Sequence, residues 1–248
     1  MTDSPIDPAL ATSFDRAAEV YERARPSYPD AVVDWLVPAD TVDALDLGAG
    51  TGKLTRALVS RGLHVVAVDP APNMLAQLTA ALPEVRAIAG SAESIPLAHA
   101  SVDLVVVAQA WHWVDPVRAE PEVARVLRPG GSLALVWNVR DDRVGWVAEL
   151  LGIIGEGGSN GLLDTPPRPA PPFEPADHVV VDWTHELDRA ALLALVASRS
   201  TFIAAEPEQR AAVTSRVEGL LATHPDLAGR EVFEMPYRTV CWRARLGV

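Results

Sequence analysis

The heptapeptide Asp46-Leu47-Gly48-Ala49-Gly50-Thr51-Gly52 stands between a predicted strand at 42–47 and a predicted helix at 54–61. Glycine adopts backbone conformations that other residues avoid, so glycines at alternate positions allow a tight turn and let a ligand approach the backbone. The first N–H groups of the helix behind the turn have no partner inside that helix. The segment therefore predicts a ligand-binding loop between a strand and a helix.

Strands and helices alternate through the region that contains this loop. The predicted strands are 42–47, 64–69, 85–89, 102–108 and 132–137, and the predicted helices are 54–61, 73–81 and 116–127. Such alternation is typical of a parallel, doubly wound α/β sheet. The aliphatic run at 102–108 fits a strand that is covered by helices on both faces. Residues 128–131, Arg-Pro-Gly-Gly, are predicted to form a turn before the fifth strand.

The flanking regions complete the predicted architecture. Helices are expected at 11–25, 30–37, 144–154, 188–199 and 207–223, strands at 178–185 and 233–244, and a surface loop at 155–175. We expect an α/β fold with a Rossmann-like, doubly wound sheet of about seven strands, mostly parallel with an antiparallel C-terminal edge strand, plus helical lid elements. One domain is expected over residues 1–248. Its parts are a cap at 1–41, a core at 42–137, lid and substrate-side insertions at 138–230 with a proline-rich loop at 159–175, and a last strand at 231–248.

The composition argues against several classes of protein. The 248 residues are 49% hydrophobic and carry a net charge of −12, which argues against a nucleic-acid partner because binding phosphates requires a basic face. A single cysteine, Cys241, excludes a disulfide framework and favours a reducing compartment. The first residues lack the features of a signal peptide and no apolar run reaches membrane-spanning length. We expect a cytoplasmic protein without a membrane partner.

Three kinds of nucleotide loop can be compared with the glycine-rich segment. A phosphate-binding P-loop requires glycine where Leu47 stands and serine or threonine where Leu54 stands, so that pattern fails twice. A dinucleotide fingerprint that starts at Gly48 requires glycine where Lys53 stands, so it fails once. Asp69 ends the next predicted strand, where an acidic side chain can accept both hydroxyls of a ribose.

The remaining pattern, Asp-x-Gly-x-Gly-x-Gly, resembles the first motif of class I methyltransferases of type 11, which depend on S-adenosylmethionine (SAM). Gly90-Ser91-Ala92-Glu93-Ser94-Ile95-Pro96-Leu97 is similar to the segment that follows the third strand in that family. Leu127-Arg128-Pro129-Gly130-Gly131 is similar to the family's turn before strand five. The resemblance covers most of the chain and implies SAM as the methyl donor, S-adenosylhomocysteine as the product, and no metal.

The same resemblance assigns residues to the cofactor. Ser91 matches a position that is often an aspartate bound to the adenine amino group, so we expect that contact to fall to Glu93 or to the backbone at Ala92. The candidate cofactor-binding residues are Tyr21, Arg25, Asp46, Gly48, Ala49, Gly50, Gly52, Asp69, Met74, Ser91, Ala92, Glu93 and Gln109.

Two further segments resemble a subgroup that methylates small molecules, of the trans-aconitate and farnesoic-acid type. They are Tyr21-x-x-x-Arg25-Pro26-x-Tyr28-Pro29 and Gln109-Ala110-Trp111-His112-Trp113. The resemblance implies a small-molecule acceptor, with O-methylation of a carboxylate or hydroxyl favoured. It also makes Tyr21 and Arg25 partners for the SAM carboxylate, an interaction that is strong and directional for arginine; a salt bridge from Arg25 to a surface acid is the alternative.

Ligands of such sheets bind beyond the C-terminal ends of the strands, which is where 109–113 is expected. His112 is the candidate catalytic residue, because a neutral imidazole can remove a proton from a hydroxyl or amine; an orienting role is the equal alternative. Aromatic rings can also face a sulfonium by cation–π attraction. The candidate substrate-pocket residues are Tyr28, Trp111, Trp113, Trp137 and Arg199. No grouping of Cys, His and carboxylates has metal-site spacing, so we expect no metal.

Two alternatives come from other functional classes. An NAD(P)-dependent oxidoreductase conflicts with Lys53 in the place of the third glycine. A non-catalytic, SAM-binding regulatory module predicts a damaged glycine loop or the loss of Asp69, and both features are intact. An RNA methyltransferase is disfavoured by the charge and by the lack of an Asn/Asp-Pro-Pro-Tyr motif after the fourth strand.

Overall fold

The computed structural model describes residues 25–156, 167 and 169–247, and the chain divides into two compact units. The sheet unit consists of Ser27–Asn138, Pro166–Val181 and Thr239–Val248. The helical unit consists of Met1–Pro26, Val139–Thr165 and Asp182–Arg238. The division falls within three long strands, and each unit is described by itself. Apart from Arg25, the helix predicted at 11–25 lies outside the described residues.

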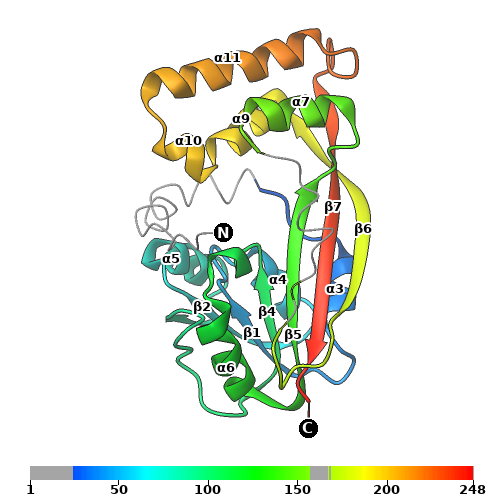
Figure 1. The fold of residues 1–248 in the computed structure, drawn as a ribbon. Helices are drawn as coiled ribbons and strands as arrows, with labels where there is room; N and C mark the ends of the chain where they lie inside the picture. The colour runs from blue at the N-terminus through cyan, green and yellow to red at the C-terminus, as the bar shows by residue number, and fades with distance from the viewer. Residues whose placement is uncertain (1–24, 157–166, 168, 248) are drawn as a thin grey trace. The chain divides into compact units, whose positions relative to one another are not determined.

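Seven strands form one sheet in the order β3-β2-β1-β4-β5-β7-β6 (Figure 1). Neighbours from β3 to β5 pair in parallel, and the sheet is mixed because antiparallel strands complete it at one edge. This confirms the predicted Rossmann-like sheet. The strands are β1 Asp43–Leu47, β2 His64–Asp69, β3 Arg86–Ala89, β4 Val102–Ala108, β5 Leu127–Arg140, β6 Asp177–Asp188 and β7 Val232–Arg245.

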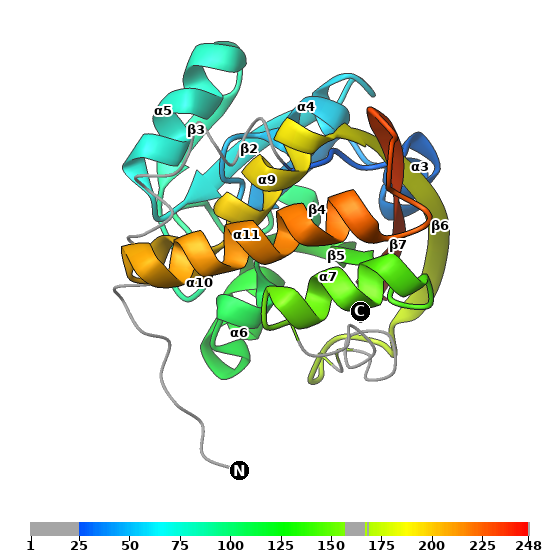
Figure 2. The ribbon, with the colours of Figure 1, turned by 90° about the horizontal axis from the view of Figure 1, so that it is seen from above.

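Helices cover both faces of the parallel part of the sheet (Figures 1 and 2). The helices of the sheet unit are α3 Asp30–Leu36, α4 Lys53–Val59, α5 Pro72–Ala81 and α6 Pro116–Val126. Leu36 of α3 and Leu58 of α4 pack in one buried cluster with Leu104 of β4. α6 lies against the opposite face of the sheet. Because apolar side chains are removed from water on both faces, the central strands are almost continuously aliphatic.

The strand order reverses beside β1, since β2 lies on one side of it and β4 on the other. In open α/β sheets ligands bind at such a switch point, beyond the C-terminal ends of the strands. The glycine loop follows β1 directly, and residues 109–113 follow β4 directly. The topology therefore brings the two segments that the sequence predicts to be functional to the same edge of the sheet.

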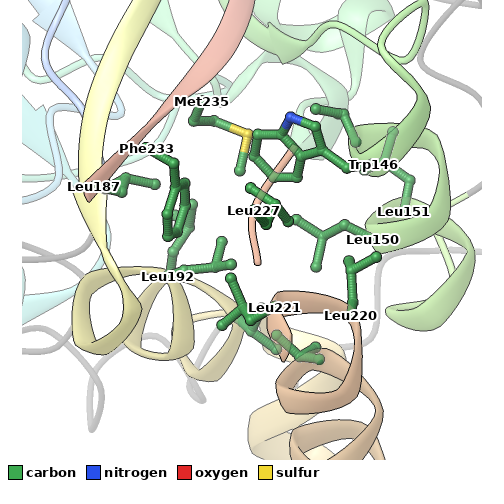
Figure 3. Close-up of a cluster of buried hydrophobic side chains, with 14 of the residues drawn as sticks. Trp146, Leu150, Leu151, Leu187, Leu192, Leu220, Leu221, Leu227, Phe233 and Met235 are labelled. Atoms are coloured by element: carbon green, nitrogen blue, oxygen red, sulfur yellow. The ribbon is translucent and has the colours of Figure 1, made fainter. Parts of the chain in front are cut away.

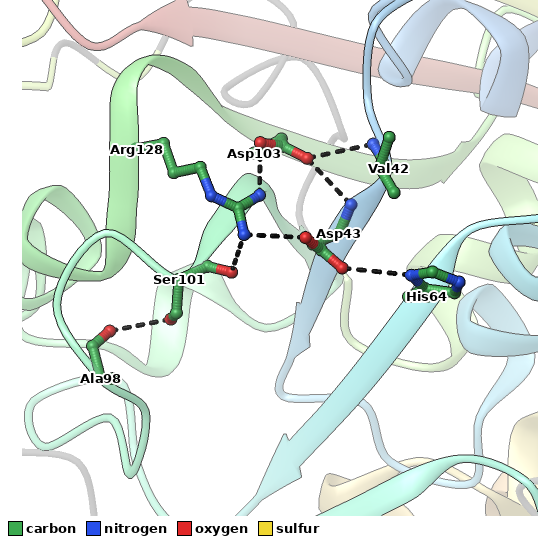
Figure 4. A network of polar contacts seen from close by, with 7 residues as sticks. All are labelled: Val42, Asp43, His64, Ala98, Ser101, Asp103 and Arg128. Carbon is green, nitrogen blue, oxygen red and sulfur yellow. Dashed lines mark hydrogen bonds and ion pairs between the residues drawn. The ribbon is translucent and has the colours of Figure 1, made fainter.

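A polar network holds the opposite ends of these strands together (Figure 4). Oδ2 of Asp103, in β4, accepts hydrogen bonds from the N–H groups of Val42 and Asp43 at 3.0 and 2.9 Å. Arg128 of β5 bridges the two carboxylates, at 2.6 Å to Asp103 and 2.8 Å to Asp43. Burial raises the pKa of Asp103, but these hydrogen bonds and the Arg128 charge outweigh it and hold the pKa below its usual range. The network fixes β1 against β4 and β5.

Two predictions for the sheet unit need correction. β5 begins at Leu127 and takes in Arg128–Gly131, which the sequence predicts as a separate turn. The pairing with β4 shifts between Val102 and Leu104 to accommodate the extra residues, and Gly130 has φ +79°. Within the predicted surface loop at 155–175, Phe173 is buried and bridges to Leu246. The proline-rich composition of this segment did not predict that Phe173 would be buried.

The helical unit has its own apolar core (Figure 3). Among its described residues the helices are α7 Gly145–Ile153, α9 Arg189–Ala197, α10 Ser200–Ala204 and α11 Pro207–Thr223. Trp146 of α7, Leu192 of α9 and Leu221 of α11 contribute to this core, and the Trp146 ring lies edge-on to Phe233 of β7. α11 spans the range predicted for it, because Pro207 and a capping box at Glu206 define its start.

Candidate active site

The glycine loop bends where the sequence places its glycines. Gly48, Gly50 and Gly52 have φ values of +75°, +56° and +87°, a region that residues with a side chain rarely adopt. A Cβ on Gly48 would come within 2.8 Å of Cβ of Ala110, and a Cβ on Gly52 within 2.9 Å of Cγ of Leu78. A Cβ on Gly50 would meet nothing within 4 Å. Two glycines are thus required by packing, and the third leaves open space in front of the loop backbone.

Asp69 ends β2 and holds the glycine loop through its carboxylate. The Gly50 N–H donates to Oδ2 and the Ala71 N–H donates to Oδ1, each at 2.8 Å. The carbonyl of Val68 accepts from the first two N–H groups after β1, at 2.8 and 3.1 Å. The ribose hydroxyls are the further partners that the sequence predicts for this carboxylate.

Asp46 lies behind the loop and is fully buried. Its Oδ2 accepts a hydrogen bond from the Thr55 hydroxyl at 2.6 Å, and its Oδ1 has no hydrogen-bond partner among the described residues. Burial, opposed by the Thr55 hydrogen bond and reinforced by the charge of Asp69, raises the pKa of Asp46 to about 7. Near neutral pH this carboxyl is therefore partly protonated, which lowers the cost of burying it.

The raised pKa predicts a pH-dependent stability that Asp46→Asn removes. The unfolded chain ionises at about pH 4, whereas the folded chain holds the proton up to about pH 7. Stability is therefore lost as the pH rises between these values. Since asparagine imitates the protonated carboxyl, urea unfolding should show the variant gaining about 2–3 kcal/mol relative to wild type from about pH 5 to pH 8. Parallel stability curves for the two proteins would show that Asp46 does not titrate in this way.

The segment predicted to face adenine is built around Glu93. The Asp115 N–H donates to its Oε1 at 3.1 Å. Burial raises the pKa of Glu93, but hydrogen bonds from the Asp115 N–H, its own N–H and the Ser91 hydroxyl outweigh it, so the net shift is downward. Ser91 therefore supports a carboxylate two residues along, at the segment where the family often has aspartate. Ala92, in this segment, and Met74, in α5, are buried.

The aromatic segment after β4 starts with a strained residue. Gln109 has φ +59°, which is rare for a residue with a side chain and costs about 1–2 kcal/mol. Two hydrogen bonds hold it there: its N–H donates to the Val136 carbonyl at 2.8 Å, and its side-chain amide donates to the Asn138 carbonyl at 3.3 Å. A short 3-10 helix, Trp111–Trp113, begins two residues later. Ala110, immediately before this 3-10 helix, is the residue whose Cβ lies against Gly48.

His112 is exposed and lies between two tryptophans. Its ring centroid is 4.8 Å from that of Trp113, and the indole N–H of Trp137 donates to its Nδ1 at 3.5 Å. An indole N–H can only donate, so Nδ1 is the acceptor in this contact. A general base would have to release that lone pair, so the contact favours the orienting role of His112. Trp137 itself is buried edge-on against Trp242, with ring centroids 5.3 Å apart. Trp137 therefore contacts the aromatic segment through its indole N–H.

Asn138 is a residue that the sequence analysis missed. Its amide N–H donates to the Ser27 carbonyl at 3.2 Å, and its Oδ1 accepts from the Thr239 hydroxyl at 2.6 Å. Asn138, at the end of β5, therefore connects β7 with the segment that precedes α3. That segment includes the partly buried Tyr28. The sequence feature that could have identified Asn138 is its position directly after the fifth aliphatic strand.

The remaining candidates lie elsewhere. Tyr21 is outside the described residues. Arg25 and Arg199 belong to the helical unit, where the charge of Arg25 acts on Arg199. In the described part of the chain, no group of His, Cys, Asp and Glu has the arrangement of a metal site. None of the helices in that part has both the length and the apolar character needed to cross a membrane.

Comparison with known proteins supports the assignment that this geometry suggests. Residues 45–135 match the family model of the methyltransferase domain. An uncharacterized methyltransferase of Mycobacterium tuberculosis is 56% identical over 246 residues, which cover 99% of this chain and 100% of that protein. A malonyl-[acyl-carrier protein] O-methyltransferase of Dechloromonas aromatica is 37% identical over 146 residues, 53% of this chain and 55% of the relative.

A solved structure agrees with the sequence relatives. The proposed type II methyltransferase of Anaeromyxobacter dehalogenans has a TM-score of 0.61 and 29% identity, covering 90% of this chain and 97% of that one. These relatives do not support the oxidoreductase alternative. The chain belongs to the class I SAM-dependent methyltransferases.

Proposed function

We propose that this enzyme transfers the methyl group of SAM to a small-molecule acceptor, with a carboxylate or hydroxyl oxygen as the favoured nucleophile. The observation that carries the proposal is the loop around Gly50, which is clamped by Asp69 and has open space where a Cβ would be. The relative from Dechloromonas aromatica, which is named for O-methylation, supports an oxygen acceptor. The single cysteine is consistent with a cytoplasmic enzyme.

The residues present fit the cofactor. Asp69 would accept the ribose hydroxyls, and Glu93 with the backbone at Ala92 would face the adenine amine. Gly48, Ala49, Gly50 and Gly52 would let the ligand approach the backbone. The same proposal gives cofactor contacts to Tyr21, Arg25, Met74, Ser91 and Gln109, and gives Asp46 a supporting place behind the loop.

When bound, SAM supplies a methyl group on a positively charged sulfur. The chain's part is to hold the acceptor oxygen in line with that methyl group, because orientation accounts for much of the acceleration in such reactions. Trp111 and Trp113 follow β4 next to the glycine loop, where their rings would exclude water and attract positive charge. Tyr28 and Trp137, in the same unit, complete the proposed acceptor side. Arg199, in the helical unit, stays a candidate for holding an acidic group of the acceptor.

A transfer assay tests the proposed function. The chain is incubated with SAM that carries a labelled methyl group and with sets of small acids and small alcohols or phenols, and the products are identified by mass spectrometry. We expect a labelled methyl ester or ether from at least one set, with release of S-adenosylhomocysteine. Tight binding of SAM without transfer to any acceptor would favour the non-catalytic regulatory module.

His112→Ala tests the candidate catalytic residue. For a hydroxyl acceptor we expect kcat to fall by about 100-fold, which is typical for loss of a general base, with the Kd of SAM unchanged. Trp137→Phe removes the donor to Nδ1 but keeps an aromatic ring. Because it frees the lone pair that a general base needs, kcat should be retained or should rise, whereas a loss would favour the orienting role. Near-normal turnover of the true substrate by His112→Ala would remove the general-base role.

A further inference from the structure

Two carboxyl groups lie on one face of the sheet where the glycine loop begins. In the register of β1 and β2, Asp46 stands opposite Ala67, and Asp69 follows Ala67 by two residues. Side chains two residues apart on a strand point to the same face, so the carboxyl groups of Asp46 and Asp69 are neighbours on that face. The charge of Asp69 acts on Asp46. The glycine loop therefore has two groups beside it that can carry negative charge.

The surroundings of Asp46 disfavour its negative charge. Its side chain is fully buried, its strand partners Ala67 and Val106 are aliphatic, and α4 offers it the Thr55 hydroxyl at 2.6 Å. Among the residues that the structure describes, Oδ1 of Asp46 has no hydrogen-bond partner and the carboxyl group forms no ion pair. Burial is the main reason why the pKa of Asp46 is raised to about 7. Such surroundings favour the protonated form until a positive charge comes near.

The proposed cofactor brings a positive charge to this end of the sheet. The sulfonium of SAM is joined through one carbon to the ribose ring, whose hydroxyls are the predicted partners of Asp69. Opposite charges attract more strongly inside a protein than in bulk water, so a sulfonium near this face favours the ionised form of Asp46. S-adenosylhomocysteine lacks the methyl group, and its sulfur is uncharged. Ionised Asp46 can therefore distinguish the two ligands by charge.

We propose that Asp46 is a specificity-determining residue for the cofactor: its ionised form favours SAM over S-adenosylhomocysteine, and SAM binding drives this ionisation. The O–H bond of the carboxyl group breaks as SAM binds, and the proton passes to the solvent. Because Asp46 is fully buried behind the loop, it acts through its charge and is not a catalytic residue. The inference rests on the proposed function and deepens it, because it makes the selection of the cofactor depend on pH.

Proton release measured by calorimetry tests the inference on the full-length chain. SAM is titrated at pH 6.5 in buffers of different ionisation enthalpy, which gives the number of protons released per ligand. A tenfold preference of SAM for the ionised form brings the pKa of Asp46 from about 7 to about 6, which releases roughly half a proton at this pH. We expect this release from the wild type in excess of that from Asp46→Asn, and no such excess with S-adenosylhomocysteine.

The affinities of the two ligands give a second readout. Asp46 must lose its proton to favour SAM, so the preference grows as the pH rises through 7. From pH 5.5 to pH 7.5, the ratio of the Kd of S-adenosylhomocysteine to the Kd of SAM should rise about sixfold for the wild type relative to Asp46→Asn. The comparison with this variant cancels the titration of the histidines and of the ligands themselves.

Two further variants separate the role of Asp46 from a general effect of substitution. Asp103→Asn is the matched control, because it removes a carboxylate at the opposite end of the strands whose pKa lies below its usual range. It should release as many protons as the wild type. Thr55→Val keeps the shape of the side chain but removes the hydroxyl that donates to Asp46, so its proton release should move to higher pH. A purely structural role of Asp46 would not produce this movement.

The outcomes separate this inference from the proposed function. The inference is overturned if the wild type and a folded Asp46→Asn variant release equal numbers of protons with SAM, or if S-adenosylhomocysteine produces the same excess as SAM. Binding of both ligands without these differences leaves the proposed function intact. A folded wild-type protein that binds neither ligand contradicts the proposed function, and this inference with it.

Discussion

Substituting asparagine for Asp69 is expected to weaken SAM binding by about 100-fold. Asp69 is the carboxylate that holds the glycine loop, through 2.8 Å bonds from the N–H groups of Gly50 and Ala71. Asparagine has the same shape but offers one oxygen, so one of these N–H groups would face an amide N–H. The ribose hydroxyls would lose a charged acceptor. Two weakened hydrogen bonds to a charged group, at about 1.5 kcal/mol each, account for the expected loss.

Asp103→Asn is the matched control for that substitution. The Asp103 carboxylate also accepts two backbone N–H groups, from Val42 and Asp43, but at the opposite end of the strands. Both variants should therefore unfold more easily than the wild type, as followed by thermal unfolding without ligand. Only the Asp69 variant should lose affinity for SAM in a calorimetric titration. Equal affinity of the two variants would show that Asp69 is a structural clamp and not a cofactor contact.

Substituting alanine for each loop glycine is expected to show which glycine is needed for stability and which for SAM binding. Gly48→Ala should lower the free energy of unfolding by about 2–4 kcal/mol. Of this, about 1–2 kcal/mol comes from the left-handed backbone, and the rest from a Cβ placed 2.8 Å from Cβ of Ala110. Gly62→Ala is the control for the backbone contribution, because Gly62 has φ +81° and open space around its Cβ position. It should cost only about 1–2 kcal/mol.

Gly50→Ala completes this comparison. Its stability should match that of the Gly62 variant, since Gly50 has φ +56° and nothing within 4 Å of the added carbon. Its affinity for SAM should fall by at least about tenfold, because the methyl group fills the space through which the ligand approaches the backbone. Urea unfolding and SAM titration on the three variants measure both effects. Unchanged SAM affinity of Gly50→Ala would place the cofactor elsewhere.

The parallel half of the fold could be predicted from local sequence because its signals are local. β2 and β4 have the bounds that their aliphatic runs indicate, and the glycines at 48–52 mark the turn after β1. α11 was equally predictable from Pro207 and the apolar spacing that follows. By contrast, the start of β5 was misplaced, since Pro129 and Gly130 suggest a turn while pairing with β4 continues through a shifted register.

The site was only partly predictable for a different physical reason. The glycine loop and the segment 109–113 could be found because each is a contiguous motif, and the sheet topology then brings them together. The hydrogen bond from Gly50 to Asp69 joins the loop after β1 to the end of β2, so only the fold shows it. The placement of Asp46 and Asp69 on one face of the sheet has no sequence signature either, because it depends on the register of β1 against β2.

Calorimetric titration of the full-length chain with SAM, and then with S-adenosylhomocysteine, is the most direct test of the central claim. We expect both ligands to bind, with Kd values between about 1 μM and 1 mM, the range of KM that most enzymes show for their substrates. Asp69→Asn should reduce both affinities, and Asp103→Asn should reduce neither. Failure of a folded wild-type protein to bind either ligand would contradict the assignment of residues 46–52 as a SAM-binding loop.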